Sequence, residues 1–107
     1  MLIEDLRSFS FAASRGFLAV DGVNGAGKST LLARLTEYLA ERELPFVLTR
    51  EPGGTALGSR LRPILLESHE LSVLAELFLF AADRAEHVSS LIRPALAEGR
   101  LVVTDRF

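Results

Sequence analysis

The sequence contains no cysteine and only two histidines, which are far apart along the chain. Without thiols the protein can form neither a disulfide framework nor a thiolate metal site, and two distant histidines disfavour a zinc site. A chain without cysteine is compatible with a reducing cytosol.

The sequence also lacks a long apolar run and an excess of positive charge. No apolar run approaches the length that a membrane span needs, and the start, MLIEDLRSFS, carries Glu4 and Asp5 where a signal peptide would be positive. A formal net charge of -2 and a pI near 5.7 provide no basic field for nucleic acid or anionic lipid. We therefore expect a soluble, cytoplasmic protein that binds neither nucleic acid nor a membrane.

What the chain does have is ample apolar content for one domain, since 49% of its 107 residues are hydrophobic. Residues 1–15 are interpreted as a polar and aromatic extension that precedes the first strand. Residues 16–107 then form the predicted domain.

Three short apolar runs predict strands: GFLAV (Gly16–Val20), FVLT (Phe46–Thr49) and the apolar part of RLVVTDRF, which ends at 104–106. The first run leads directly into glycines, a pattern typical of a fully buried strand.

The segments between these runs have helical periodicity. An amphipathic helix is predicted from Lys28 to a point before Pro45, and a second helical piece follows, in which Pro63 either starts a turn or kinks the helix. The longest helix is predicted from about Ser72, with Pro94 opening or bending a further segment. Gly99 has the character of its C-terminal cap.

Strands that alternate with helices predict an α/β fold with a parallel sheet and helices on its faces. In such a fold the functional groups gather at the carboxyl ends of the strands. Those ends carry Asp21-Gly22, Arg50-Glu51 and Asp105-Arg106.

The stretch DGVNGAGKST matches G-x-x-x-x-G-K-[ST] and lies between a predicted strand and a predicted helix, as that motif requires. Its glycines let backbone amides surround phosphate oxygens, and the positive end of the following helix adds its field. Lys28 would bridge the outer phosphates of a nucleoside triphosphate, and the Ser29 hydroxyl would contact magnesium. The alternative is a glycine-rich turn with a capping serine. The predicted phosphate-binding residues are Gly22, Val23, Asn24, Gly25, Ala26, Gly27, Lys28, Ser29 and Thr30.

Other candidate residues follow from position. Arg50, at a strand end, could clamp a second phosphate, or it could simply form a surface ion pair with Glu51 or another neighbour. Phe80 and Arg84 share a helix face, so that one could stack on a base while the other binds its edge, although Phe80 alone could equally fill the core.

Asp105 and Arg106 directly follow an apolar strand, beside the phosphate loop. The carboxylate could orient a metal and the guanidinium could neutralise a phosphoryl group, or the pair could be a capping aspartate and an exposed arginine. Glu76, His69 and His87 are interpreted as structural or solvated.

NGAGKSTLL resembles the phosphate loop of ABC-type transport ATPases, whereas VDGVNGAGKST also resembles the opening of thymidylate kinases. The downstream segments TREPGGT, ELFLFAADRAEHV, IRPALAEG and DRF resemble bacterial thymidylate kinases in the right order, over about Gly16–Phe107. The resemblance implies a P-loop NTPase fold of the nucleoside monophosphate kinase type, of which this chain carries the first three strands.

The same resemblance implies phosphoryl transfer from ATP to dTMP, giving dTDP, with Mg²⁺ as the cofactor. It leaves a homodimer of the full-length protein as one option. The implied residues fall into three groups: Lys28, Asp105 and Arg106 for catalysis; Ser29 and Asp105 near the metal; and Asn24, Arg50, Phe80, Arg84 and Arg106 for dTMP. Among these, Arg50 would hold the monophosphate, Phe80 would stack on thymine and Arg84 would bind a thymine carbonyl.

Three positions depart from the family pattern. Phe107 stands where tyrosine or histidine is usual, and Asn24 stands where an acidic residue is common. Gly25 stands where some members have an arginine in the loop, and the members without it supply catalytic arginines from a lid further along the chain. The resemblance stops before that lid. We therefore expect an N-terminal part of a longer kinase, one that folds poorly and is inactive alone. An ABC-type ATPase module and a non-catalytic nucleotide-binding remnant are the alternatives.

Overall fold

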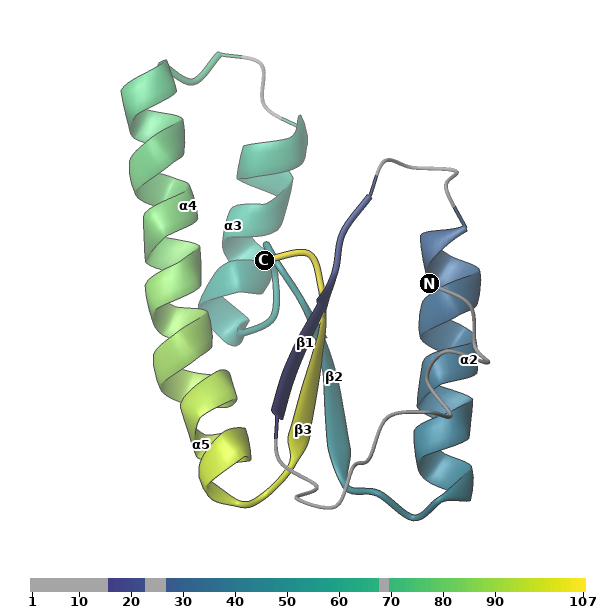
Figure 1. The fold of residues 1–107 in the computed structure, drawn as a ribbon. Coiled ribbons are helices and arrows are strands. Elements are labelled where there is room, and N and C mark those ends of the chain that lie inside the picture. The colour runs from purple at the N-terminus through teal and green to yellow at the C-terminus, as the bar shows by residue number, and fades with distance from the viewer. Residues whose placement is uncertain (1–15, 23–26, 68–69) are drawn as a thin grey trace.

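The computed structural model describes residues 16–22, 27–67 and 70–107, so the expected N-terminal extension, the loop residues 23–26 and His69 lie outside the described part. The elements follow one another in the predicted alternating order (Figure 1). They are β1 (Gly16–Val20), α2 (Lys28–Glu41), β2 (Phe46–Arg50), α3 (Ala56–Glu67), α4 (Val73–His87), the π-helical η1 (Val88–Ile92), α5 (Arg93–Ala97) and β3 (Leu101–Asp105).

The three strands form a parallel sheet in the order β1-β3-β2, which confirms the predicted α/β class. Residue Leu101 of β3 aligns with Gly16 on one side and with Phe46 on the other. Two backbone hydrogen bonds continue this pairing past the strands: Arg106 N donates to Val20 O at 2.9 Å, and Glu51 N donates to Asp105 O at 3.0 Å. The three carboxyl ends are therefore held side by side.

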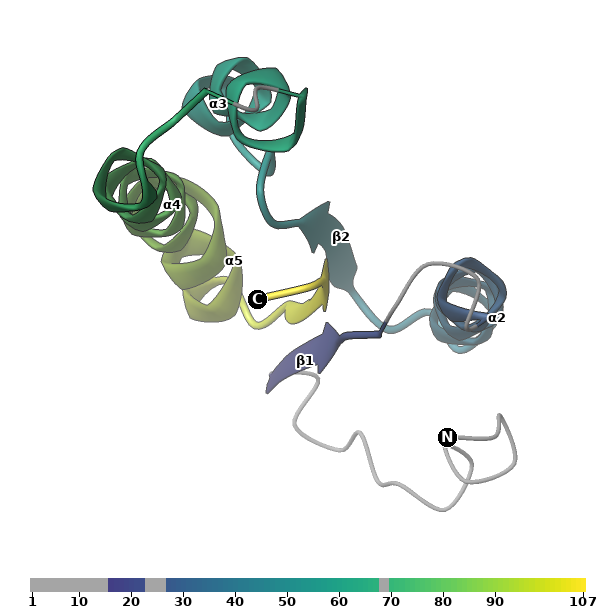
Figure 2. The same cartoon turned by 90° about the horizontal axis from the view of Figure 1, so that it is seen from above.

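Helices cover both faces of the sheet, with α2 on one side and α3, α4 and α5 on the other (Figure 2). Alternate residues of β3 face the two layers, because successive side chains of a strand point in opposite directions. Leu101 and Val103 pack against α2, and Val102 packs against η1 and α5. The helical members of the two clusters are Leu32, Leu35 and Leu39 on one face and Ile92 and Ala95 on the other.

The prediction that β1 is fully buried is wrong. Its residues alternate between half-buried and exposed, and the side chain of Phe17 is 40% exposed. The described chain pairs β1 only with β3, and the contacts of β1 with the α2 core come from Leu18 and Val20. An apolar run records the preference of a strand for burial, and the neighbouring elements decide whether both faces are covered.

The helix boundaries agree closely with the sequence signals. The Ser72 hydroxyl caps α4 by accepting a hydrogen bond from Ala75 N at 3.1 Å. Pro94 lies in the first turn of α5, and Gly99 follows that helix with a left-handed φ of 79°. Helix α3 runs through Pro63, which therefore does not start a turn.

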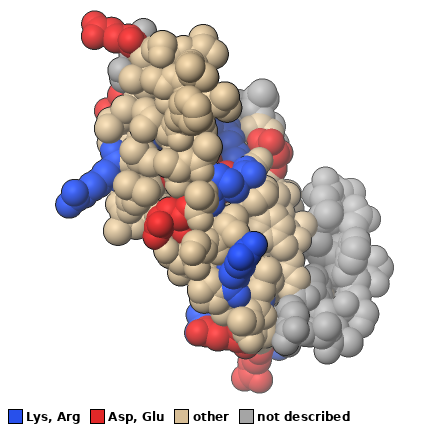
Figure 3. All heavy atoms as spheres, turned by 90° about the vertical axis from the view of Figure 1, so that its left-hand side faces the viewer, with Lys and Arg blue, Asp and Glu red and all other residues tan. Residues whose placement is uncertain are grey.

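The N-terminal half of α4 presents apolar side chains to solvent, and the upper part of this face is almost free of charge (Figure 3). Val73, Leu74, Leu77 and Phe78 are each at least 60% exposed. None of the described helices is both long and apolar enough to cross a membrane.

Candidate functional site

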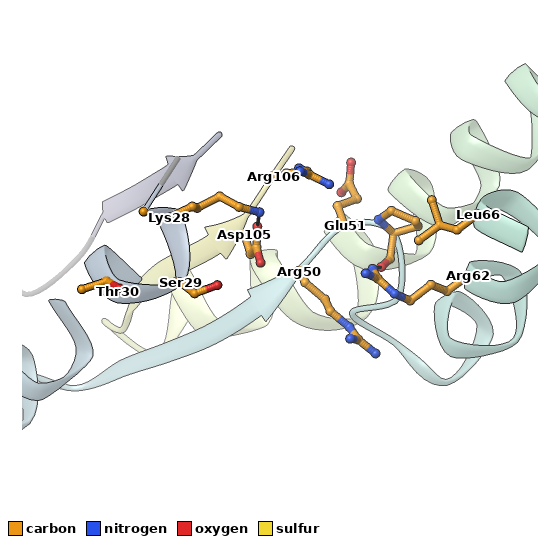
Figure 4. Close-up of a pocket in the computed structure, with 11 residues that line it drawn as sticks. Lys28, Ser29, Thr30, Arg50, Glu51, Arg62, Leu66, Asp105 and Arg106 are labelled. Carbon is orange, nitrogen blue, oxygen red and sulfur yellow. Dashed lines mark hydrogen bonds and ion pairs between the residues drawn. The ribbon is translucent and has the colours of Figure 1, made fainter. Parts of the chain in front are cut away.

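Two neighbouring cavities lie at the carboxyl edge of the sheet. The first, of about 470 Å³, is bounded by the start of α2, the ends of β2 and β3, and α3 (Figure 4). Its lining residues are Gly27, Lys28, Ser29, Thr30, Arg50, Glu51, Pro52, Arg62, Leu66, Asp105 and Arg106. Two of the three predicted strand ends, Arg50-Glu51 and Asp105-Arg106, thus contribute to this cavity.

The second cavity, of about 590 Å³, is more apolar and lies against α4. It is lined by Asp21, Glu51, Pro52, Leu66, Leu77, Phe80, Ala81, Arg84, Arg106 and Phe107. Four residues line both cavities, namely Glu51, Pro52, Leu66 and Arg106. A ligand with a polar end and an aromatic end could therefore occupy both at once.

The described part of the phosphate loop leads directly into α2. Gly27 has a left-handed φ of 82° and its carbonyl accepts from Leu31 N at 3.0 Å, so it turns the chain into the helix. Lys28 follows with a side chain that is only 12% exposed, and its Nζ forms an ion pair with Asp105 Oδ1. The predicted loop members Val23, Asn24, Gly25 and Ala26 lie outside the described residues.

Arg106 is fixed beside the end of β1. Its Nη2 donates to Gly22 O at 3.0 Å, and its Nε lies 3.8 Å from Asp21 Oδ1. The backbone of Arg106 is left-handed, with a φ of 68°, which is uncommon for a residue with a side chain. The turn after β3 therefore carries this guanidinium to the wall that the two cavities share.

Arg50 lines the first cavity and is exposed. The alternative of an Arg50–Glu51 ion pair is not observed among the described residues, because the Glu51 carboxylate pairs with α4 instead.

Arg62 was not singled out from the sequence, yet it lines the same cavity from α3, where its Nη1 donates to Pro52 O. Its segment was interpreted only through its apolar period, which indicates the buried face of a helix and not the loop that a polar side chain will meet.

The loop after β2 is held tightly against α4. The Glu51–Pro52 peptide is cis, Gly53 has a φ of 109°, and Gly53 N donates to the buried Asp83 Oδ1 at 3.1 Å. At Gly54 a Cβ atom would lie 2.6 Å from His87 Nε2, so only glycine fits here. The two glycines allow the loop to approach the helix closely.

Phe80 and Arg84 both line the second cavity, so the structure brings this predicted pair together. Phe80 is half-buried and in the cavity wall, so it does not simply fill the core. Arg84 Nε donates to Glu51 Oε1 at 2.6 Å, and its guanidinium lies 3.4 Å from the centroid of the Phe107 ring.

His87 is fully buried and therefore structural, not solvated. Its Nδ1 lies 2.7 Å from Glu51 Oε2, and its Nε2 lies 2.8 Å from Thr49 Oγ1. Glu76 is half-buried in the first turn of α4 and lines neither cavity. Sequence spacing could not reveal the His87–Glu51 contact, because the two residues are 36 positions apart.

The match to known proteins agrees with this arrangement. The family model described as thymidylate kinase matches residues 20–107. The chain belongs to the thymidylate kinase family. The match covers the phosphate loop, both cavities and the final strand, which is most of the described structure.

Relatives and a solved structure support the same assignment. The chain is 52% identical over 93 residues to a thymidylate kinase of Symbiobacterium thermophilum, covering 85% of this chain and 44% of the relative. It is 55% identical over 93 residues to one of Desulfovibrio desulfuricans, covering 85% and 43%.

The crystal structure of thymidylate kinase from Ehrlichia chaffeensis is similar with a TM-score of 0.79 and 41% identity, over 87% of this chain and 51% of that one. The chain thus has the fold of the family, and it spans less than half the length of the two curated relatives.

Proposed function

We propose that the full-length protein transfers the terminal phosphoryl group of ATP to dTMP, giving ADP and dTDP. The observation that supports this proposal is the pair of cavities with a shared wall. One cavity is lined by the described end of the phosphate loop and by several cationic side chains, and the other is lined by an aromatic ring and a guanidinium on one helix face. Membership of the thymidylate kinase family supports the choice of ATP and dTMP.

In this proposal the ATP phosphates bind at the start of α2. Backbone amides of residues 22–30 would donate to the phosphate oxygens, and the helix N-terminus favours their negative charge. Lys28 would bridge the outer phosphates, exchanging its ion pair with Asp105 for phosphate oxygens.

The acceptor would span the wall between the cavities. Arg50 and Arg106 would hold its phosphate in the first cavity, because guanidinium groups bind phosphate bidentately. Its thymine would lie in the second cavity, stacked on Phe80 and hydrogen-bonded by Arg84. Asn24 would approach the sugar of the acceptor.

The residues at the first cavity suit a magnesium ion that binds with ATP. The Ser29 hydroxyl and the Asp105 carboxylate line the same cavity and supply only oxygen donors. No group of three acidic or histidine residues that could hold a metal is found in the described part of the chain. This fits magnesium, which is usually held by one or two carboxylates together with substrate phosphates and water. When bound, the ion would neutralise charge on the phosphates.

The reaction needs no covalent enzyme intermediate. A phosphate oxygen of dTMP would attack the γ-phosphorus of ATP as the bond to the ADP oxygen breaks, so the protein contributes position and charge neutralisation. Lys28 and Arg106 line the cavity where this charge would develop, and fixed cations there stabilise the transition state.

We expect the full-length natural protein to produce ADP from ATP only when dTMP is present. The measurement is a coupled assay of ADP formation, with dTDP identified by chromatography. Turnover that is independent of dTMP, or dTDP that does not form, would contradict the proposal.

Two variants test the roles of the two cavities separately. Lys28→Ala should lower kcat by about 100-fold, the loss typical of removing one transition-state donor. Arg84→Ala should raise the KM for dTMP far more than that for ATP, and equal changes in both would count against its assigned role.

A further inference from the structure

Arg84 is held in place by a chain of polar contacts that runs into the core. Its Nε donates to Glu51 Oε1, and the other carboxylate oxygen of Glu51 contacts His87 Nδ1. The side-chain exposure falls along this chain from 41% at Arg84 to 9% at Glu51 and 0% at His87. The exposed end lies in the cavity wall, and the other end is fully buried.

The buried end of this chain of contacts is held on both sides. His87 lies between Glu51 and Thr49, with both ring nitrogens engaged at 2.7 and 2.8 Å. An ionised carboxylate only accepts hydrogen bonds, so Nδ1 of His87 carries the proton that faces Glu51. Nε2 lies against the Thr49 hydroxyl, so both ring nitrogens of His87 have a partner.

The loop that carries Glu51 is fixed independently. Gly53 N donates to Asp83, and Gly54 packs directly against the His87 ring. Asp83, Arg84 and His87 share one side of α4, so a single helix face holds both the loop and its carboxylate.

We propose that Glu51 and His87 are positioning residues that set the orientation of Arg84 toward the acceptor base; this rests on the proposed function. Of the three guanidinium nitrogens of Arg84, only Nε makes a hydrogen bond to another described residue. The contact with Glu51 therefore fixes the plane of the guanidinium and leaves its terminal nitrogens for a ligand. An arginine without this partner would lose rotamer freedom only on binding, at a cost in affinity.

The test replaces His87 in the full-length protein by two amide side chains, each of which can mimic one ring nitrogen. The amide nitrogen of His87→Asn can donate to Glu51 in place of Nδ1, whereas that of His87→Gln reaches the position of Nε2 and contacts only Thr49. His87→Leu removes both contacts, and Glu51→Gln replaces the carboxylate without changing its volume. Glu98→Ala, which breaks an exposed pair with Arg100 away from both cavities, is the control.

We expect His87→Gln and His87→Leu to raise the KM for dTMP about ten-fold, the effect of losing one charge-assisted hydrogen bond, while the KM for ATP changes less than two-fold. His87→Asn should have a KM for dTMP within two-fold of the wild-type value. Glu98→Ala should leave the KM for dTMP unchanged. Thermal unfolding is measured in parallel. His87→Asn and His87→Gln should lower the Tm by similar amounts, because each variant loses one contact.

Equal KM values for dTMP in His87→Asn and His87→Gln would overturn the proposal, as would parallel changes in both KM values. If His87→Leu does not fold, Glu51→Gln supplies the comparison: it should raise the KM for dTMP, and a KM for dTMP equal to that of the wild type would also overturn the proposal. Wild-type protein that forms no dTDP would instead refute the proposed function, and this inference with it.

Discussion

The ring of Phe107 makes two contacts at the position where the family pattern has tyrosine or histidine. The ring lies under the Arg84 guanidinium at 3.4 Å and meets Phe17 edge-on, with centroids 4.9 Å apart and planes inclined by 70°. Arg84 is thus held by a carboxylate on one side and an aromatic face on the other. The sequence indicated only that Phe107 lacks a polar atom, and the structure shows what the ring contacts.

We expect Phe107→Leu to raise the KM for dTMP about three- to five-fold, because an exposed cation–π contact contributes roughly 0.5–1 kcal/mol. Phe107→Tyr keeps the ring and should behave as the wild type. Steady-state kinetics of the full-length protein with dTMP as the varied substrate measure both. A leucine variant with an unchanged KM would show that the ring does not support Arg84.

Single residues also show where prediction from sequence ends. Lys28, Arg50 and Asp105 were predicted to meet because each follows or opens an element at the carboxyl edge of a parallel sheet, and they do line one cavity. Arg62 and the His87–Glu51 contact were not predicted, because they depend on how α3 and α4 pack against a loop. Apolar periodicity indicates which helix face is buried but does not identify the loop beside it.

At the level of elements, α3 approaches the Glu51–Gly54 loop and α4 unusually closely through Gly58. A Cβ atom at Gly58 would lie 2.5 Å from Asp83 Oδ1 and 3.0 Å from Gly53 Cα. The helix therefore carries glycine, despite its poor helix propensity, where three segments meet. The order and type of the elements were predictable from periodicity, but this closeness was not, since it arises from tertiary packing.

We expect Gly58→Ala to destabilise the full-length protein by up to about 2 kcal/mol, because an overpacking cost of about 1–3 kcal/mol outweighs the roughly 1 kcal/mol gain in helix propensity. Ser59→Ala, at the next and exposed position of α3, should change stability by less than about 0.5 kcal/mol. Urea unfolding followed by circular dichroism measures both. An alanine at 58 that stabilises the protein would contradict the close packing described here.

Across the whole molecule, the first cavity joins layers that are otherwise separate. Its walls come from α2 on one face of the sheet, α3 on the other, and the ends of β2 and β3 between them. A nucleotide bound there would contact all of these elements together. Binding should therefore stabilise the native state as a whole and not only the loop at the start of α2.

We expect Mg²⁺-ADP at one hundred times its Kd to raise the unfolding free energy of the full-length protein by about 2.7 kcal/mol. Lys28→Ala should largely abolish this gain while keeping the corresponding gain from dTMP. The Tm measured with and without each ligand tests both statements. A Tm that responds to neither ligand in the wild type would argue against nucleotide binding at these cavities.

The central place of β3 has a consequence for the order in which the described chain can assemble. Among the described residues, the strands β1 and β2 do not pair with each other, and each pairs only with β3, the last of these three strands in chain order. Leu101 aligns with Gly16, so closing the first ladder brings together residues 85 positions apart (101 − 16). Such distant contacts form slowly because the loop entropy is lost before any pairing compensates for it. On the ribosome, these three strands remain without a sheet until the Leu101–Asp105 segment has emerged.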